Sequence, residues 1–310
     1  PKSLLNYLLV VMFSFVLIAC DDNDNNNNNS DAMLSIAEIV TLDENFSTLA
    51  LALQTAGLDA ALEEGTYTVF APTNEAFAKL GDDTINALLA DPDALAEILL
   101  YHVIADAEVD SEAAIASAGS TVPMANGDSV ALSLDGDNLL VNVSTVTDVD
   151  IMATNGIVHV IDTVLIPPAK EGTPSDNIVE TAIAAGSFNT LYAALQATGL
   201  DALLADENKT FTVFAPTDAA FNALPPGTVD ALLMDLPALT AILATHVIED
   251  AAVNSITAFS LNGSEVTTAS GDNVTLSIVD GVLNVNNAKV VTYDIYTTNG
   301  IIHVIDAVIN

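Results

Sequence analysis

The sequence is one unit written twice. The segment 68–73, with the sequence TVFAPT, returns at 212–217, and NGIVHVID at 155–162 returns as NGIIHVID at 299–306. Both pairs are 144 residues apart (212 − 68 and 299 − 155). This period is close to the commonest size of a single domain, and it is far longer than the repeats of roughly 20–50 residues that stack into solenoids. The repeat therefore predicts two globular domains.

The spacing of the repeat changes once. Gln54 and Gly57 match Gln196 and Gly199 at an offset of 142 (196 − 54), whereas every later landmark has the offset 144. The two additional residues fall in the polar stretch 206–209. A surface loop is predicted there, because loops accept extra residues at little cost in free energy.

Charge composition excludes one class of partner. Five Lys and Arg residues stand against 42 Asp and Glu residues, for a formal net charge of −37. Binding to a phosphate backbone requires clustered cations, so nucleic acid is excluded as a partner, and anionic lipid head groups are disfavoured for the same reason. Apolar residues make up 51% of the chain, which is enough for two ordinary cores.

The N-terminal region is predicted to contain a secretion signal and a tether. Residues 1–20 combine Lys2 with an apolar run and end at Leu17-Ile18-Ala19-Cys20, which resembles the lipobox of bacterial lipoproteins. Cys20 is the only cysteine, so lipidation of Cys20 and attachment to a membrane are predicted. The Asp- and Asn-rich residues 21–32 are predicted to be a solvated tether. A calcium loop is rejected there, because Asn27 stands where that loop needs glycine.

Periodicity within each unit changes from helical to strand-like. Apolar residues at helical spacing occupy the first third of the unit, and 67–70 reads as a strand that Pro72 closes. Thr73 and Thr217 are predicted to cap the helices that follow them. A helix is predicted to continue through His102, and the segments after the Asn-Gly pairs read as strands that are apolar on both faces.

No catalytic or metal-binding pattern stands out. The four histidines occupy two positions, used once in each unit, and both positions lie among apolar residues, so they are predicted to be buried and neutral. Histidine and cysteine spacings typical of metal sites are missing, and no cofactor is expected. Ser129 lacks the second glycine of a nucleophile elbow, so hydrolase activity ranks last among the functions considered.

At these motifs the chain resembles the fasciclin (FAS1) family. FAPTNEAF at 70–77 and FAPTDAAF at 214–221 resemble the first family motif, and 155–162 and 299–306 resemble the second. Tyr101-His102 resembles the Tyr-His motif, whereas the second copy has Thr245 before His246. The resemblance covers residues 33–168 and 174–310, with a linker at 169–173.

The resemblance implies a mixed α/β (α+β) fold. Each domain should hold seven strands in a wedge or sandwich flanked by helices, and should serve in cell adhesion or matrix contacts. The motif residues that it implies for partner binding are Tyr101, His102, Asp150, Ile151, His246, Asp294 and Ile295.

The leading functional hypothesis is a non-catalytic, lipid-anchored adhesion protein that is secreted to the bacterial outer membrane or cell surface, with the periplasmic face as the alternative. Its expected partner is a cell-surface or matrix protein or a polysaccharide. Glycan binding is the rival hypothesis, although the chain has no Trp. Tyr192 and either Tyr293 or Tyr296 would then be the aromatic platform.

Overall fold

The computed structural model of the chain describes residues 33–63, 65–170 and 172–309. Cys20, the predicted signal peptide and the predicted tether lie outside the described residues.

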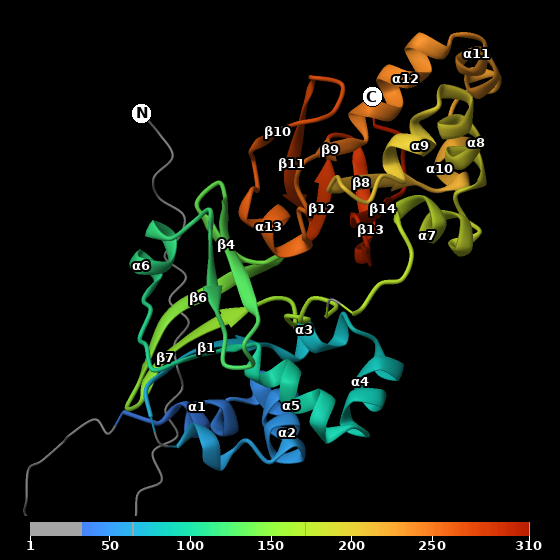
Figure 1. Cartoon of the computed structure of the whole chain (residues 1–310). Coiled ribbons are helices and arrows are strands. Elements are labelled where there is room, and N and C mark those ends of the chain that lie inside the picture. Colours follow the sequence, from blue (N-terminus) through green and yellow to red (C-terminus); the bar gives the residue numbers. More distant parts are fainter. Residues whose placement is uncertain (1–32, 64, 171, 310) are drawn as a thin grey trace, which may run out of the picture. The chain divides into compact units, whose positions relative to one another are not determined.

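The first domain places helices before, between and beside its strands (Figure 1). Its helices are α1 (Ile36–Leu42), α2 (Ser47–Ala56), α3 (Asn74–Ala78), α4 (Asp82–Leu89), α5 (Pro92–Leu100) and α6 (Ser111–Ala116), with the short 3-10 helices η1 (Glu44–Phe46) and η2 (Ala60–Leu62). Its strands are β1 (Tyr67–Pro72), β2 (Val103–Ala105), β3 (Ser120–Pro123), β4 (Ser129–Asp135), β5 (Asn138–Val141), β6 (Ser144–Ala153) and β7 (Gly156–Ile161).

The second domain repeats this order. Its helices are α7 (Ile178–Ala185), α8 (Asn189–Thr198), α9 (Leu200–Leu204), α10 (Asp218–Asn222), α11 (Thr228–Met234), α12 (Leu236–Thr245) and α13 (Ser255–Ser260). Its strands are β8 (Phe211–Pro216), β9 (Val247–Glu249), β10 (Glu265–Thr267), β11 (Asn273–Val279), β12 (Val282–Val285), β13 (Ala288–Thr297) and β14 (Gly300–Ile305).

Within the described residues, each domain forms one seven-stranded sheet. The strand order is β2-β1-β7-β6-β5-β4-β3 in the first domain and β9-β8-β14-β13-β12-β11-β10 in the second. The pairs β1–β7 and β8–β14 are parallel, and the other pairs are antiparallel. The predicted mixed α/β fold, with seven strands and flanking helices in each domain, is confirmed.

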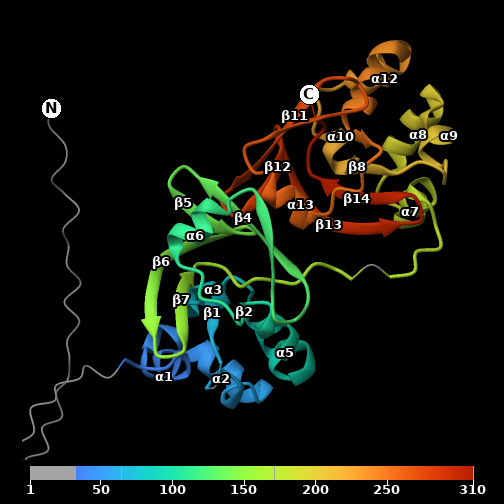
Figure 2. The ribbon, with the colours of Figure 1, turned by 60° about the vertical axis from the view of Figure 1, so that its left-hand side comes forward.

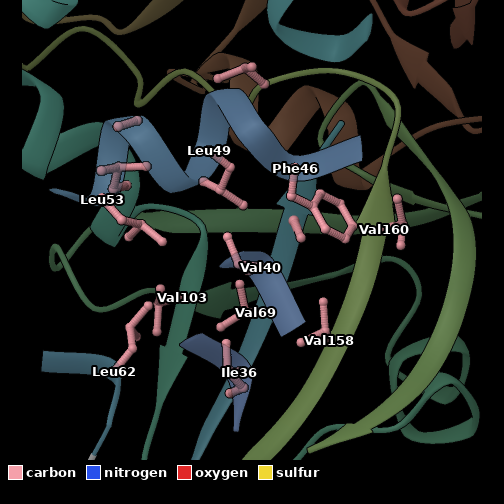
Figure 3. Close-up of a cluster of buried hydrophobic side chains, with 14 of the residues drawn as sticks. Ile36, Val40, Phe46, Leu49, Leu53, Leu62, Val69, Val103, Val158 and Val160 are labelled. Carbon is pink, nitrogen blue, oxygen red and sulfur yellow. The ribbon is translucent and has the colours of Figure 1, made fainter. Parts of the chain in front are cut away.

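Strand β1 separates two apolar layers of the first domain, because successive side chains on a strand point to opposite faces. Val69 faces the helices, where it packs with Ile36 and Val40 of α1 and with Leu49 of α2 (Figure 3). Phe70 faces the other way, into a second cluster that the curved sheet encloses. In Figure 1, α1 to α5 gather on one side of β1 and β7, and α6 lies beside β4 in both Figures 1 and 2.

The local rules hold at the motif that follows β1. The Thr73 hydroxyl accepts a hydrogen bond from the backbone N–H of Ala76 at the start of α3, and Thr217 does the same for Ala220 in α10. Both predicted caps are therefore confirmed.

The predicted extent of one helix is wrong. Helix α5 ends at Leu100, and His102 lies in the turn after it rather than on the helix. In the second domain, α12 ends at Thr245 and His246 is the residue after the helix. The reason is that the histidine ring itself bonds a carbonyl of the last helical turn, as described next.

Candidate functional site

The Tyr-His motif lies at the end of α5 and points inward. Tyr101 is fully buried, with 0% of its surface exposed. Its hydroxyl donates a hydrogen bond to the carbonyl oxygen of Ser129 at 2.7 Å and accepts one from Nδ2 of Asn142 at 3.0 Å. Burial raises the pKa of the Tyr101 phenol, so the hydroxyl stays protonated. Tyr101 therefore fastens the end of α5 to strand β4.

His102 joins the helix end to the chain beyond β7. Its Nδ1 lies 2.8 Å from the carbonyl oxygen of Ile98, and its Nε2 accepts a hydrogen bond from the N–H of Leu165 at 2.9 Å. A carbonyl only accepts, so the hydrogen of the neutral ring is on Nδ1. Burial lowers the pKa of His102 to about 4, which keeps the ring neutral near pH 7.

The second domain repeats the histidine but not the tyrosine. His246 donates from Nδ1 to the carbonyl oxygen of Ile242 and accepts at Nε2 from the N–H of Ile309, at 2.7 and 2.9 Å. Burial lowers its pKa to about 4 as well. Thr245 stands in place of the tyrosine, and its hydroxyl donates to the carbonyl of Ala241 inside its own helix. The hydrogen bond from a tyrosine to a strand is thus a feature of the first domain.

The Asp-Ile motif forms a bulge in the long strand β6. The register of β6 against β7 shifts between Asp148 and Ile151, and Asp150 has a left-handed φ of 58°. The Asp150 carboxylate accepts hydrogen bonds from the N–H and the hydroxyl of Ser111, the first residue of α6. The hydrogen bond from the Ser111 hydroxyl lowers the pKa of Asp150. The bulge therefore aims a carboxylate at the N-terminus of a helix.

The other histidine of the first domain, His159, is hydrogen-bonded to the backbone of this bulge. His159 on β7 accepts a hydrogen bond at Nδ1 from the N–H of Asp150 and donates from Nε2 to the carbonyl of Val109. Its ring stacks on Phe70, with 5.7 Å between ring centroids. In the second domain, Asp294 bonds Ser255 and is supported by His303 in the same way.

The structure therefore sorts the motif residues by depth. Tyr101, His102, His246 and Asp294 are buried, and a fully buried side chain offers no atom to a partner on the surface. Asp150, Ile151 and Ile295 are partly exposed. The two isoleucines also pack against the helix-side cores of their domains.

Two asparagines, Asn155 and Asn299, connect distant segments of their domains through side-chain hydrogen bonds. An Asn-Gly pair by itself predicts only a turn, yet the Oδ1 of Asn155 accepts from the N–H of Ile36 at 2.9 Å and its Nδ2 donates to the carbonyl of Leu62. Asn299 makes the same pair of bonds to Ile178 and Leu204. Recurrence of the asparagine in both copies was the signal, but the sequence alone gives no partner for its amide.

The second residue of each Asn-Gly pair is required by close packing. Gly156 has a φ of 145°, and a Cβ placed there would lie 1.8 Å from the carbonyl oxygen of Tyr67 on β1. At Gly300 the corresponding distance is 1.9 Å, to the carbonyl of Phe211. The glycine therefore allows β1 and β7 to pair at the start of their register.

Groups that could support catalysis or metal binding are scarce in the described part of the chain. No cluster of three or more histidine, cysteine, aspartate or glutamate side chains suited to a metal ion occurs among the described residues. Ser129 opens a strand that pairs with β3, whereas a nucleophile elbow opens a helix.

The candidate aromatic platform is partly engaged in internal contacts. Tyr192 and Tyr293 are both partly buried. The Tyr192 hydroxyl accepts from Gln196 at 2.8 Å, and Tyr293 meets Phe259 edge to face.

Among the described residues, no single helix has the length and apolar character to cross a bilayer; the bent pair α11–α12 passes that test by length and composition alone.

Comparison with known proteins agrees with the motif geometry. The model of the fasciclin domain matches residues 44–167 and 186–310. Transforming growth factor-beta-induced protein ig-h3 from Sus scrofa is 30% identical over 245 residues, which cover 78% of this chain and 34% of that protein. Protein sll1483 from Synechocystis is 43% identical over 134 residues, covering 43% of this chain and 72% of that protein. The chain thus spans about a third of the length of the first of these relatives.

A solved structure to which the chain is similar is a FAS1 domain pair from the insect cell adhesion molecule fasciclin I. It is 22% identical and covers 88% of this chain and 95% of its own, with a TM-score of 0.41. The family model matches both halves of the chain, each half contains the same motif network, and the relatives extend the match across most of the sequence. The chain belongs to the fasciclin family, with two fasciclin domains in tandem.

Proposed function

We propose that this chain is a non-catalytic adhesion protein that holds a bacterial surface to a cell-surface or matrix partner through its two fasciclin domains. Membership of the fasciclin family over both halves is the observation that carries the proposal. The inward direction of the motif side chains supports it, because recognition is then left to the outer faces of the domains. Two weak contacts on one chain gain avidity through their effective concentration.

The motif residues act in this proposal mainly by shaping the surface. Tyr101 and His102 hold the end of α5, and Asp150 holds the start of α6, so each motif positions an outer helix. Asp150, Ile151 and Ile295 remain the members with atoms at the surface for direct contact with a partner.

Anchoring is a second part of the proposal. Residues 1–20 would be the lipoprotein signal, with Cys20 the lipidated residue, and residues 21–32 would carry the domains 33–168 and 174–310 away from the membrane. Replacing Cys20 by serine should move the protein from the membrane fraction to the soluble fraction. Retention of Cys20→Ser in the membrane fraction would contradict the anchor.

The adhesive role is tested by deleting residues 174–310 and measuring attachment of cells to biofilm matrix. We expect weaker attachment, because one domain cannot provide bivalent contact. Equal attachment with matched amounts of folded protein at the surface would contradict the bivalent mechanism.

Binding to a glycan array that is lost in Tyr293→Ala would instead favour glycan recognition.

A further inference from the structure

A groove runs along the helical face of the first domain. It lies between α1, α2 and η2 and has a volume of about 620 Å³; α1 and α2 are neighbours in Figure 2. This volume is within the range of roughly 300–1,000 Å³ that is typical of binding sites. Its lining includes Leu42, Ala50, Leu53, Gln54, Asp59 and Glu63.

The groove has an apolar floor and an acidic rim. Leu53 and Ala50 of α2 form part of the floor, and Leu42 at the end of α1 leaves 68% of its surface exposed. Glu38 and Asp59 stand on the exposed rim together with Glu63. The lining contains no lysine or arginine to pair with these carboxylates. The lining therefore favours an occupant that brings both apolar surface and positive charge.

The second domain supplies an internal comparison. At the offset of 142 that holds for this part of the repeat, Tyr192 takes the place of Ala50 and Ala205 takes the place of Glu63. Gln196 donates a hydrogen bond to the Tyr192 hydroxyl at 2.8 Å. Tyr192 is partly buried and packs against the helix-side core of its domain. A bulky ring thus occupies in the second domain the position at which the first domain has an alanine in its groove.

Charge narrows the choice of occupant further. The predicted tether at 21–32 contains aspartates and no lysine or arginine, so the acidic rim repels that part of the chain. A second copy of the chain also carries a net charge of −37 and few cations. The rim and the overall charge instead favour a cationic partner, whose approach the field of the protein accelerates.

We propose that this groove is a docking site for a basic, amphipathic segment of a partner protein, with an apolar side chain on the floor and lysine or arginine side chains at Asp59 and Glu63. The geometry resembles helix-in-groove recognition, in which apolar anchors at helical spacing enter a hydrophobic groove. The site deepens the proposed adhesive function by naming the chemistry of one partner, and it rests on that function only for its biological setting.

The test uses the full chain and a fluorescent synthetic peptide with leucine and lysine at helical spacing. Binding is followed by fluorescence anisotropy, and a scrambled peptide of the same composition is the reference. We expect the ordered peptide to bind the unaltered protein more tightly than the scrambled one. Equal binding of both peptides would mean that only the net charge attracts them, which would overturn the proposal.

Ala50→Tyr is the decisive variant, because it copies the ring found in the second domain without changing charge. Gln54 is in place to bond the new hydroxyl as Gln196 bonds Tyr192, so the variant should fold. We expect it to lose at least about tenfold in affinity, or about 1.4 kcal/mol. Tyr192→Ala, the reverse change in the second domain, should leave affinity unchanged. Unchanged binding by folded Ala50→Tyr would overturn the proposal.

A second variant removes the rim charges without filling the groove. Asp59→Asn combined with Glu63→Gln should weaken binding and reduce its dependence on salt, because two charged contacts are lost. Binding that keeps its full salt dependence would place the peptide elsewhere.

Cell attachment is measured in parallel with Ala50→Tyr. Loss of peptide binding with normal attachment would keep the docking site and remove its adhesive role.

Discussion

At the scale of single residues, His102 and His246 give the chain a defined response to acid. Each ring accepts a backbone N–H at Nε2, so protonation would place a hydrogen against a hydrogen. Their pKa values fall from 6.5 to about 4 because they are buried. The unfolded state therefore binds more protons between pH 6.5 and 4, and stability from these groups, complete above pH 6.5, is lost as pH falls through that window.

This pH effect should be measurable as a difference between proteins. For His102→Gln, the free energy of unfolding in urea should fall less than in the unaltered protein between pH 6.5 and 4. The difference should be on the order of 3 kcal/mol, which is the free energy that corresponds to a pKa shift of this size. Comparison with the variant cancels the titration of the carboxylates, which is common to both. Identical pH profiles would show that the ring takes up its proton as readily in the folded state as in the unfolded state.

Gly156 is the second residue for which the geometry dictates an outcome. Gly156→Ala places a methyl group against the carbonyl of Tyr67 at a positive φ, so we expect a loss of more than about 2 kcal/mol of stability in urea unfolding. Gly136→Ala is the control, since Gly136 also has a positive φ but no atom within 4 Å of the added carbon. It should cost about 1 kcal/mol. Equal losses would show that backbone strain, rather than contact with β1, decides the effect.

At the scale of elements, the bulge in β6 is what places α6. Asp150→Ala removes two hydrogen bonds from the first turn of that helix, so α6 should exchange its amide hydrogens faster, and stability should fall by about 1–2 kcal/mol. Asp148→Ala changes an exposed carboxylate on the same strand and should leave the exchange of α6 unaltered. The measurement is hydrogen exchange of residues 111–116, and unchanged exchange in Asp150→Ala would contradict the role of the bulge.

Elements were also the scale at which sequence reasoning was most successful. The strand at 67–70, the threonine caps and the doubly buried β7 follow from β-branched residues, cap chemistry and apolar runs. The end of α5 was missed because the bond from His102 to Ile98 cannot be read from spacing. The partners of Asn155 and Asp150 lie 119 and 39 residues away, and such pairs are set by the tertiary fold alone.

At the scale of the whole molecule, the net charge of −37 should make stability depend on salt. Across the described residues only two ion pairs form, Lys79–Asp162 and Lys170–Glu97, so most carboxylates meet other carboxylates or water. Sodium chloride screens this repulsion, and the midpoint of thermal unfolding should therefore rise with its concentration. A midpoint that falls with salt would mean that attractive pairs outweigh repulsion.

The parallel pairing of β1 and β7 has a mechanical consequence. Six residues of each strand are in register, from Tyr67–Gly156 to Pro72–Ile161. In a parallel pair, the N-terminal end of one strand and the C-terminal end of the other lie at opposite ends of the ladder. A pull on those two ends therefore strains all its rungs together in shear instead of opening them one at a time. A domain whose strands pair in this way is suited to bear tension.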